Sequence, residues 1–178
     1  MKNIKLLTLA GVMTALTAVL ANLSVPFAGI VLTLGVYGVF LTGFLLPPRF
    51  AVLSVAAYII LGLVGAPVFA GFQAGFGVLF GPTGGFLIAY PFMTLAVSIG
   101  AKNGIKGKTA LRIALSVLLA LSLCYLFGSV QYSFWANTDI FTALKLTAIP
   151  FIPFDIGKAV LAAFTSKAML KITAYVKT

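Results

Sequence analysis

Long stretches without a charged side chain limit most strongly what this chain can fold into. No Asp, Glu, Lys or Arg lies between Lys5 and Arg49, and none lies between Arg49 and Lys102. Only 8% of the 178 residues are charged, whereas an average soluble domain has about 25%. A soluble globular surface and a disordered chain both need more charge than this. The sequence therefore predicts an integral membrane protein with a single domain over residues 1–178.

Six segments are candidates for membrane-spanning helices. Such a helix needs about 20 mostly apolar residues, with a range of about 17–25, and several segments here are short enough to favour tilted or partly buried helices. The predicted spans are Ile4–Leu23, Ile30–Leu46, Phe50–Val64, Phe86–Ile99, Ala110–Val130 and Phe154–Tyr175. The predicted fold class is an all-α bundle of six transmembrane helices. A cleaved signal peptide within Met1–Asn22 is the alternative interpretation of the first span.

The distribution of Lys and Arg predicts the orientation in the membrane, because basic residues concentrate on the cytoplasmic side. With the N-terminus inside, six crossings place ten of the twelve basic residues at the inner face and leave Lys145 and Lys158 toward the outside. The inner-face residues are Lys2, Lys5, Arg49, Lys102, Lys106, Lys108, Arg112, Lys167, Lys171 and Lys177. We therefore expect both termini in the cytoplasm.

This orientation leaves three segments outside that are rich in glycine, proline and aromatic residues. They are Ser24–Gly29, Gly65–Gly85 and Gln131–Pro153. Non-helical backbone at membrane depth is tolerated only where protein or a cavity surrounds it. We therefore expect these loops to fold over a ligand pocket at the outer mouth of the bundle.

Several classes of function are disfavoured by the residues that the chain lacks. A nucleic-acid interface needs basic residues clustered on a polar surface, and the basic residues here are separated by long neutral runs. With no His and only two acidic residues, Asp139 and Asp155, an enzyme and a metal site are both poorly supported. Cys124 lies inside an apolar span, where a small packing residue is the expected role.

The glycine-rich segment Gly65–Gly85 is the first candidate for a binding site. Its glycines let the backbone approach a ligand closely, and its amides precede the fourth span, where they can bind a carboxylate or carbonyl oxygen. Gln73 and Thr83 are its strong hydrogen-bonding side chains, and Gly84 and Gly85 are candidate amide donors. Tight glycine-mediated packing between helices is an equally open interpretation.

The second candidate is the acid and amine at the start of the sixth span, after Pro150 and Pro153. Asp155 and Lys158 are three residues apart, so a helix places them on one face. A charge inside the membrane costs roughly 2.5–3.5 kcal/mol on insertion scales, and such residues therefore usually face a cavity or the bundle interior. We expect Asp155 to accept N–H groups of a ligand and Lys158 to donate to a carbonyl or carboxylate. A purely structural ion pair is the alternative.

The first span carries a face of small residues, which allows helices to approach closely in lipid. Gly11 and Ala15 are four residues apart, as are Thr14 and Ala18. This face packs either inside the bundle or against another membrane protein.

The segment ending Gly81-Pro82-Thr83-Gly84-Gly85, followed by Pro150-Phe151-Ile152-Pro153 with Asp155 and Lys158, resembles the BioY family over nearly the whole chain. The resemblance implies a biotin-binding S component of an energy-coupling factor (ECF) transporter in a prokaryotic cell membrane. The expected partners are membrane lipid, a transmembrane coupling protein and two cytoplasmic ATPases. No cofactor is expected besides biotin as the transported ligand.

The resemblance also assigns roles to single residues. Asp155, Lys158, Gln73, Thr83, Gly84 and Gly85 would bind biotin, with Tyr58, Tyr90 and Trp135 as weaker wall or lid candidates. The first-span face of Gly11, Thr14, Ala15 and Ala18 would meet the coupling protein. Two departures from the family pattern stand out, because Phe154 replaces a usual Gly and Phe86 a usual Tyr. A self-sufficient carrier is the second hypothesis for function, and an intramembrane enzyme is the third.

Overall fold

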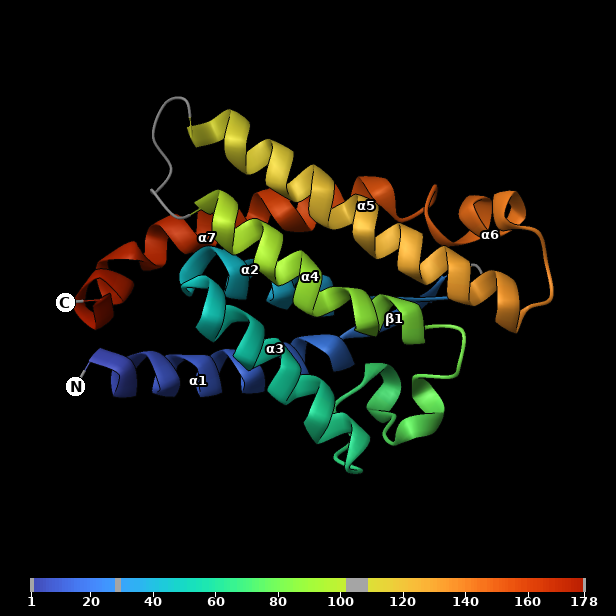
Figure 1. Ribbon diagram of the computed structural model, residues 1–178, viewed down its shortest axis with the longest axis horizontal. Helices are drawn as coiled ribbons and strands as arrows, with labels where there is room; N and C mark the ends of the chain where they lie inside the picture. Colours follow the sequence, from blue (N-terminus) through green and yellow to red (C-terminus); the bar gives the residue numbers. More distant parts are fainter. Residues whose placement is uncertain (1, 28–29, 102–108, 178) are drawn as a thin grey trace.

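The chain folds as a helical bundle, and its computed structural model describes residues 2–27, 30–101 and 109–177 (Figure 1). In these residues the elements are α1 (Lys2–Asn22), β1 (Ser24–Phe27), β2 (Ile30–Thr33), α2 (Gly35–Leu45), α3 (Pro48–Leu63), the short 3₁₀ turns η1 (Ala70–Phe72) and η2 (Phe76–Val78), α4 (Gly84–Ala101), α5 (Thr109–Trp135), α6 (Ile140–Thr147) and α7 (Ile152–Lys177). Helix α1 begins and helix α7 ends at the same end of the bundle (Figure 1).

The lengths of the described helices fit a multi-pass membrane protein. Helices α1, α4 and α5 are long and apolar enough to cross a membrane, and α6 with α7, bent by 51° at the break between them, forms a fourth candidate span. Helices α2 and α3 are apolar but shorter, with 11 and 16 residues. The helical membrane fold is therefore confirmed, whereas the count of six crossings stays a prediction.

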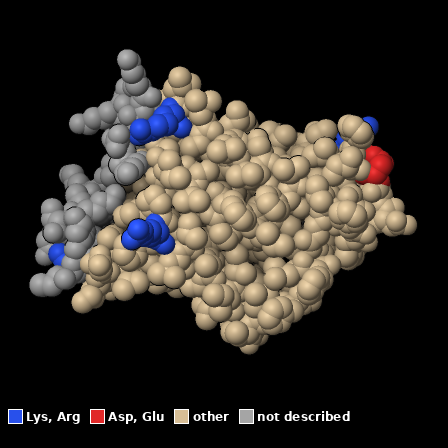
Figure 2. Space-filling view, in the orientation of Figure 1, with Lys and Arg blue, Asp and Glu red and all other residues tan. Residues whose placement is uncertain are grey.

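Charged side chains lie mainly at the two ends of the bundle. In Figure 2 most of the visible Lys and Arg atoms gather at the end that holds both termini, and the visible acidic atoms lie at the opposite end. The broad surface between them shows no charged residue in this view. This separation is what a bilayer demands of a membrane protein, although the direction of insertion stays a prediction.

The predicted span Ile30–Leu46 is wrong in its first part. Strand β2 occupies its first four residues and pairs antiparallel with β1, with Ser24 opposite Thr33. A continuous apolar run does not by itself distinguish a strand from a helix, and this run contains the β-branched residues Ile30, Val31 and Thr33. The Thr33 hydroxyl then accepts a hydrogen bond from the Gly35 N–H at 3.1 Å, where α2 begins.

The predicted loop Gln131–Pro153 is also largely helical. Helix α5 continues to Trp135, and α6 occupies Ile140–Thr147. The Asp139 carboxylate caps α6 by accepting from the Thr142 N–H at 2.9 Å. Hydrogen bonds from the Thr142 side chain and backbone lower the pKa of the exposed Asp139 carboxyl below its ordinary value. A charged N-cap of this kind stabilises the first turn of a helix that has only eight residues.

Two side chains from helix ends hold the glycine-rich segment against the bundle. At the end of α1, the Asn22 carboxamide accepts from the Phe72 N–H at 2.6 Å and donates to the Pro67 carbonyl at 3.3 Å. On α5, the Gln131 amide donates to the carbonyls of Leu79 and Gly81. The segment therefore folds back over the helices, as predicted for this loop.

Glycines permit the closest helix contacts. A Cβ on Gly85 of α4 would overlap the backbone carbonyl of Phe127 on α5, and one on Gly128 of α5 would overlap the ring of Phe86. A Cβ on Gly62 of α3 would overlap the ring of Phe69 in the loop. Such contacts need the missing side chain, because helix backbones in lipid approach closely only at small residues.

Gly85→Ala is expected to destabilise the protein by roughly 2 kcal/mol or more, since the obstacle is backbone and does not rotate away. Thermal unfolding in detergent measures the effect. Gly157→Ala on α7 is the matched control, because nothing lies within 4 Å of the added Cβ. Alanine at that exposed helical position is expected to be neutral or stabilising by about 0.5–1 kcal/mol. Equal unfolding temperatures for the two variants would contradict the close contact of α4 with α5.

Candidate functional site

A mostly apolar cavity lies where the hairpin, the glycine-rich segment and the helices α1 to α7 meet. It holds about 710 Å³ of space outside protein atoms, including the part open to the exterior. Its lining is Ala21, Leu32, Thr33, Val36, Tyr58, Phe69, Ala70, Gln73, Val78, Thr83, Phe86, Leu87, Tyr90, Cys124, Tyr125, Thr147, Phe151, Asp155 and Lys158.

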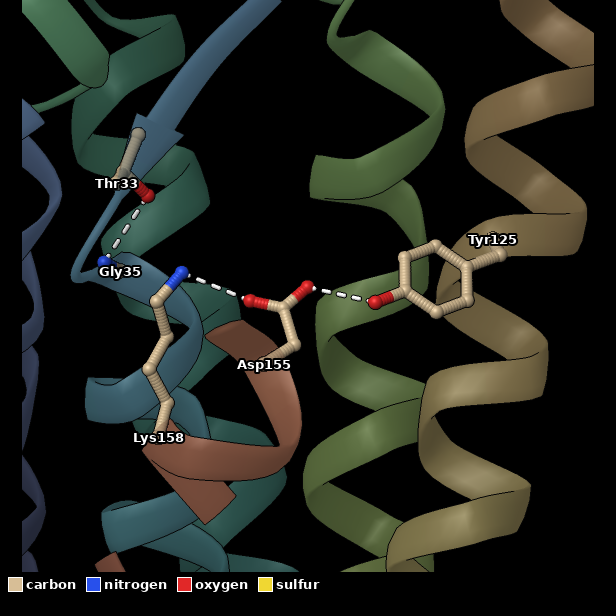
Figure 3. A network of polar contacts seen from close by, with 5 residues as sticks. All are labelled: Thr33, Gly35, Tyr125, Asp155 and Lys158. Carbon is tan, nitrogen blue, oxygen red and sulfur yellow. Dashed lines mark hydrogen bonds and ion pairs between the residues drawn. The ribbon is translucent and has the colours of Figure 1, made fainter. Parts of the chain in front are cut away.

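Three polar side chains that line this cavity form a chain of contacts (Figure 3). The Lys158 ammonium lies 2.8 Å from Asp155 Oδ1, and the Tyr125 hydroxyl donates to Asp155 Oδ2 at 2.9 Å. Asp155 is 4% exposed and Lys158 8% exposed, and Tyr125 is also buried. Both oxygens of the carboxylate therefore have a protein partner, and the two charges neutralise each other away from water.

The local structure explains why an acid is tolerated at this depth. Asp155 lies in the first turn of α7, after Pro153 near the helix start, where the helix dipole stabilises a negative charge. Lys158, one turn later, supplies the countercharge. The pair presents a strong acceptor beside a strong donor, while aromatic and aliphatic residues form the remaining walls. Among the described residues, no three His, Cys, Asp or Glu side chains group as a metal site would require.

Most of the predicted ligand-binding side chains line one cavity, although they come from four separate parts of the chain. Asp155 and Lys158 come from α7, and Tyr58 and Tyr90 come from α3 and α4. Gln73 and Thr83 come from the glycine-rich segment, and Gln73 is exposed whereas Thr83 is half-buried. The structure therefore brings six of the nine predicted side chains or amide groups together, and their role in binding stays a prediction.

Three predicted contacts lie outside the lining of this cavity. Gly84 and Gly85 are buried against the Leu79 carbonyl, Gln131 and the backbone of Phe127, so they serve helix packing. Trp135, at the end of α5, is 56% exposed and lies beside Tyr132, with 6.1 Å between the ring centroids. The packing interpretation of the glycine-rich segment therefore holds for Gly84 and Gly85. Other residues of the segment line the cavity, namely Phe69, Ala70, Gln73, Val78 and Thr83.

Sequence reasoning missed Tyr125, Thr33 and Phe69, and it assigned Cys124 to packing although this residue also lines the cavity. Tyr125 carried a usable signal, because a tyrosine in the middle of an apolar span needs a partner for its hydroxyl and only two acids exist in the chain. Thr33 carried no such signal in the sequence, because its segment was predicted to be part of a helix. Phe69 is 1% exposed and packs edge-on against Tyr58, with 5.7 Å between the ring centroids.

The two departures from the family pattern have different environments. Phe154 is 48% exposed and does not line the cavity. Phe86 lines the cavity, and its ring packs on Gly128 of α5. The cavity wall therefore lacks the hydroxyl that a tyrosine at position 86 would provide, whereas Phe154 is not part of the wall.

The small residues of α1 divide between two faces. Gly11 and Ala15 are exposed, and nothing lies within 4 Å of a Cβ built on Gly11. Ala18 is half-buried. Thr14 is buried, and its hydroxyl contacts the Ser54 hydroxyl at 3.1 Å and the Ser54 carbonyl at 2.9 Å. Thr14 therefore joins α1 to α3, one of the two packing arrangements predicted for this face, and the contact of the face with a coupling protein stays a prediction.

Tyr125→Phe is expected to weaken ligand binding by about tenfold or more, since it removes one hydrogen bond to a charged acceptor, worth about 1.5–3 kcal/mol. Calorimetric titration measures the change. Tyr132→Phe, also on α5 but away from the cavity lining, is the matched control and should bind as the wild type does. Wild-type affinity in Tyr125→Phe would mean that Lys158 alone positions the carboxylate.

Comparisons with known proteins agree with this architecture. The BioY family profile matches residues 1–175. The chain is 37% identical over 163 residues to the biotin transporter BioY of Thermotoga maritima, covering 92% of this chain and 94% of that protein. It is 36% identical to the probable biotin transporter BioY of Pyrococcus horikoshii, covering 93% and 96%.

A solved structure also matches the fold. The crystal structure of the S-component for biotin from an ECF-type ABC transporter superposes with a TM-score of 0.83 and 27% sequence identity, covering 95% of this chain and 92% of that chain. The family profile extends over nearly the whole sequence, and two relatives exceed 35% identity along almost their full length. This chain belongs to the BioY family.

Proposed function

We propose that this protein is the biotin-binding membrane subunit, or S component, of an ECF-type vitamin uptake transporter. The observation that carries the proposal is the buried Asp155–Lys158 pair, whose charged atoms lie 2.8 Å apart on the wall of an otherwise apolar cavity. A structural pair would not require a cavity beside it, because well-packed apolar residues stabilise a bundle as well as a buried ion pair does.

The chemistry of biotin matches this wall. Its ureido ring presents N–H donors next to a carbonyl acceptor, its fused rings are apolar, and its tail ends in a carboxylate. Asp155 accepts the ureido N–H groups, and Lys158, 2.8 Å away, donates to the ureido oxygen or to the tail carboxylate. Tyr58, Phe69 and Tyr90 provide apolar and aromatic surface, and Gln73 and Thr83 provide neutral hydrogen-bonding groups toward the exterior.

The proposal includes partners that supply energy. A transmembrane coupling protein and two cytoplasmic ATPases would provide the ATP chemistry, and the complex would reside in the plasma membrane of a prokaryote. The similarity to an S-component from an ECF-type transporter supports this assignment. The exposed Gly11 and Ala15, with the half-buried Ala18, form the face of α1 that would meet the coupling protein.

Calorimetric titration of the detergent-purified protein with biotin, its methyl ester, thiamine and riboflavin tests the proposal. Biotin is expected to bind at least a hundredfold more tightly than thiamine or riboflavin, a difference of about 2.7 kcal/mol. The methyl ester separates the two roles of Lys158, because it removes the negative charge of the tail and leaves the ureido ring unchanged. Tighter binding of another vitamin, or no heat with any of them, would contradict the proposal.

A further inference from the structure

A second hollow lies on the outside of the bundle, between α5 and α7. It holds about 1460 Å³ of space, including the part open to the surroundings. Helix α5 packs on α4, and α7 packs on α2, so a groove separates α5 from α7 along much of their length. Phe44 of α2 also contributes to the lining of this groove.

The groove has the composition and length of a lipid chain site. Its lining residues follow helical spacing, as in Ala110, Ala114 and Leu118 on α5. Among all the lining residues only Ser122, Tyr125 and Lys167 carry a polar side chain. The sixteen residues from Ala110 to Tyr125 extend about 22 Å along a helix, which exceeds half of a bilayer core of about 30 Å.

The two ends of the groove differ in a way that fixes the direction of an occupant. Lys167 is exposed at one end, and its ammonium lies 5.7 Å from the centroid of the Phe164 ring. Tyr125 lies at the other end, where its hydroxyl is held by Asp155 and its ring lines both the groove and the inner cavity. A negatively charged head group thus has a partner at Lys167, and Tyr125 stops an alkyl chain before the cavity.

We propose that the α5–α7 groove binds one acyl chain of an anionic phospholipid, with the head-group phosphate at Lys167. The occupant must be apolar along the groove, because α5 is itself a candidate membrane span and no water is available at that depth. Charge complementarity at Lys167 selects an anionic phospholipid over a zwitterionic one. This site is separate from the biotin cavity, since Tyr125 lies between them.

Native mass spectrometry of the protein from nanodiscs with equal amounts of phosphatidylglycerol and phosphatidylcholine tests the proposal. The wild type is expected to retain phosphatidylglycerol over phosphatidylcholine by about fivefold, the effect of one basic residue near an anionic head group. Lys167→Gln should abolish this preference. Lys145→Gln, which alters an exposed lysine on α6 away from the groove, is the matched control and should retain it.

A second pair of variants tests the groove itself. Ala114→Trp fills it from an exposed position on α5, and it should lower retention of either lipid to the background level. Ala168→Leu adds bulk to an exposed position on α7 outside the lining and should leave retention unchanged. Thermal unfolding verifies that all variants are folded.

Equal retention of the two lipids by the wild type, or wild-type retention in Ala114→Trp, would overturn the proposal. A photo-crosslinking residue at Leu118 that captures a second protein chain in the membrane in place of lipid would also overturn it.

Discussion

Lys158→Ala and Asp155→Asn are each expected to weaken biotin binding by at least tenfold, or about 1.4 kcal/mol. Each substitution removes a proposed direct contact to biotin and leaves the remaining charged group without its partner. Breaking a buried pair costs about 3–5 kcal/mol when one charge stays behind, so both substitutions should also destabilise the fold. Calorimetric titration in detergent measures affinity, and thermal unfolding measures the loss of stability separately.

The chain offers matched controls for both substitutions. Lys145→Ala and Asp139→Asn alter the same residue types at exposed positions on and before α6, away from the cavity lining. They should change the affinity by no more than about twofold. The double variant of Asp155 and Lys158 should bind more tightly than the sum of the single effects predicts, because it leaves no uncompensated charge. Wild-type affinity in both folded single variants would make the pair purely structural.

Ala15→Trp is expected to abolish biotin uptake in cells that contain the ATPase module, with at least a tenfold fall in rate, while biotin binding stays within about twofold of the wild type. Ala15 is exposed on the face of α1 that also carries Gly11. An indole at this position prevents another helix from approaching closely. Because the cavity is lined by Ala21 and by no earlier residue of α1, binding should be spared.

Uptake of labelled biotin and co-purification with the coupling protein measure this effect. Leu119→Trp, at a 54% exposed position on α5, is the control for adding an indole to the membrane-facing surface and should transport normally. Loss of binding together with normal assembly would contradict the role of α1. Uptake by the chain alone, indifferent to loss of the ATPases but abolished by an uncoupler, would favour the self-sufficient carrier.

The charged part of the candidate site could be predicted from the sequence, but its neutral partners could not. A lone acid and amine three residues apart in an apolar chain admit few arrangements, and Asp155 and Lys158 do form an ion pair on the cavity wall. Tyr125 belongs to the same network but lies thirty residues away, and sequence spacing does not show which distant hydroxyl meets the carboxylate. Sequence spacing also did not show that Thr33 lines the cavity, because its strand lies within an apolar run that was predicted to be a helix.

The sequence by itself determined the membrane class and the approximate bounds of α1, α3, α4, α5 and α7, because hydropathy over about 20 residues is a local property. It also identified Asp155 and Lys158 as charged residues within an otherwise apolar segment. The tertiary structure decided which glycines are packing contacts, since that depends on what a Cβ would meet on a neighbouring helix. It likewise divided the small residues of α1 between an outward face and the contact of Thr14 with Ser54. Contacts between distant segments arise only from packing, so no local pattern specifies them.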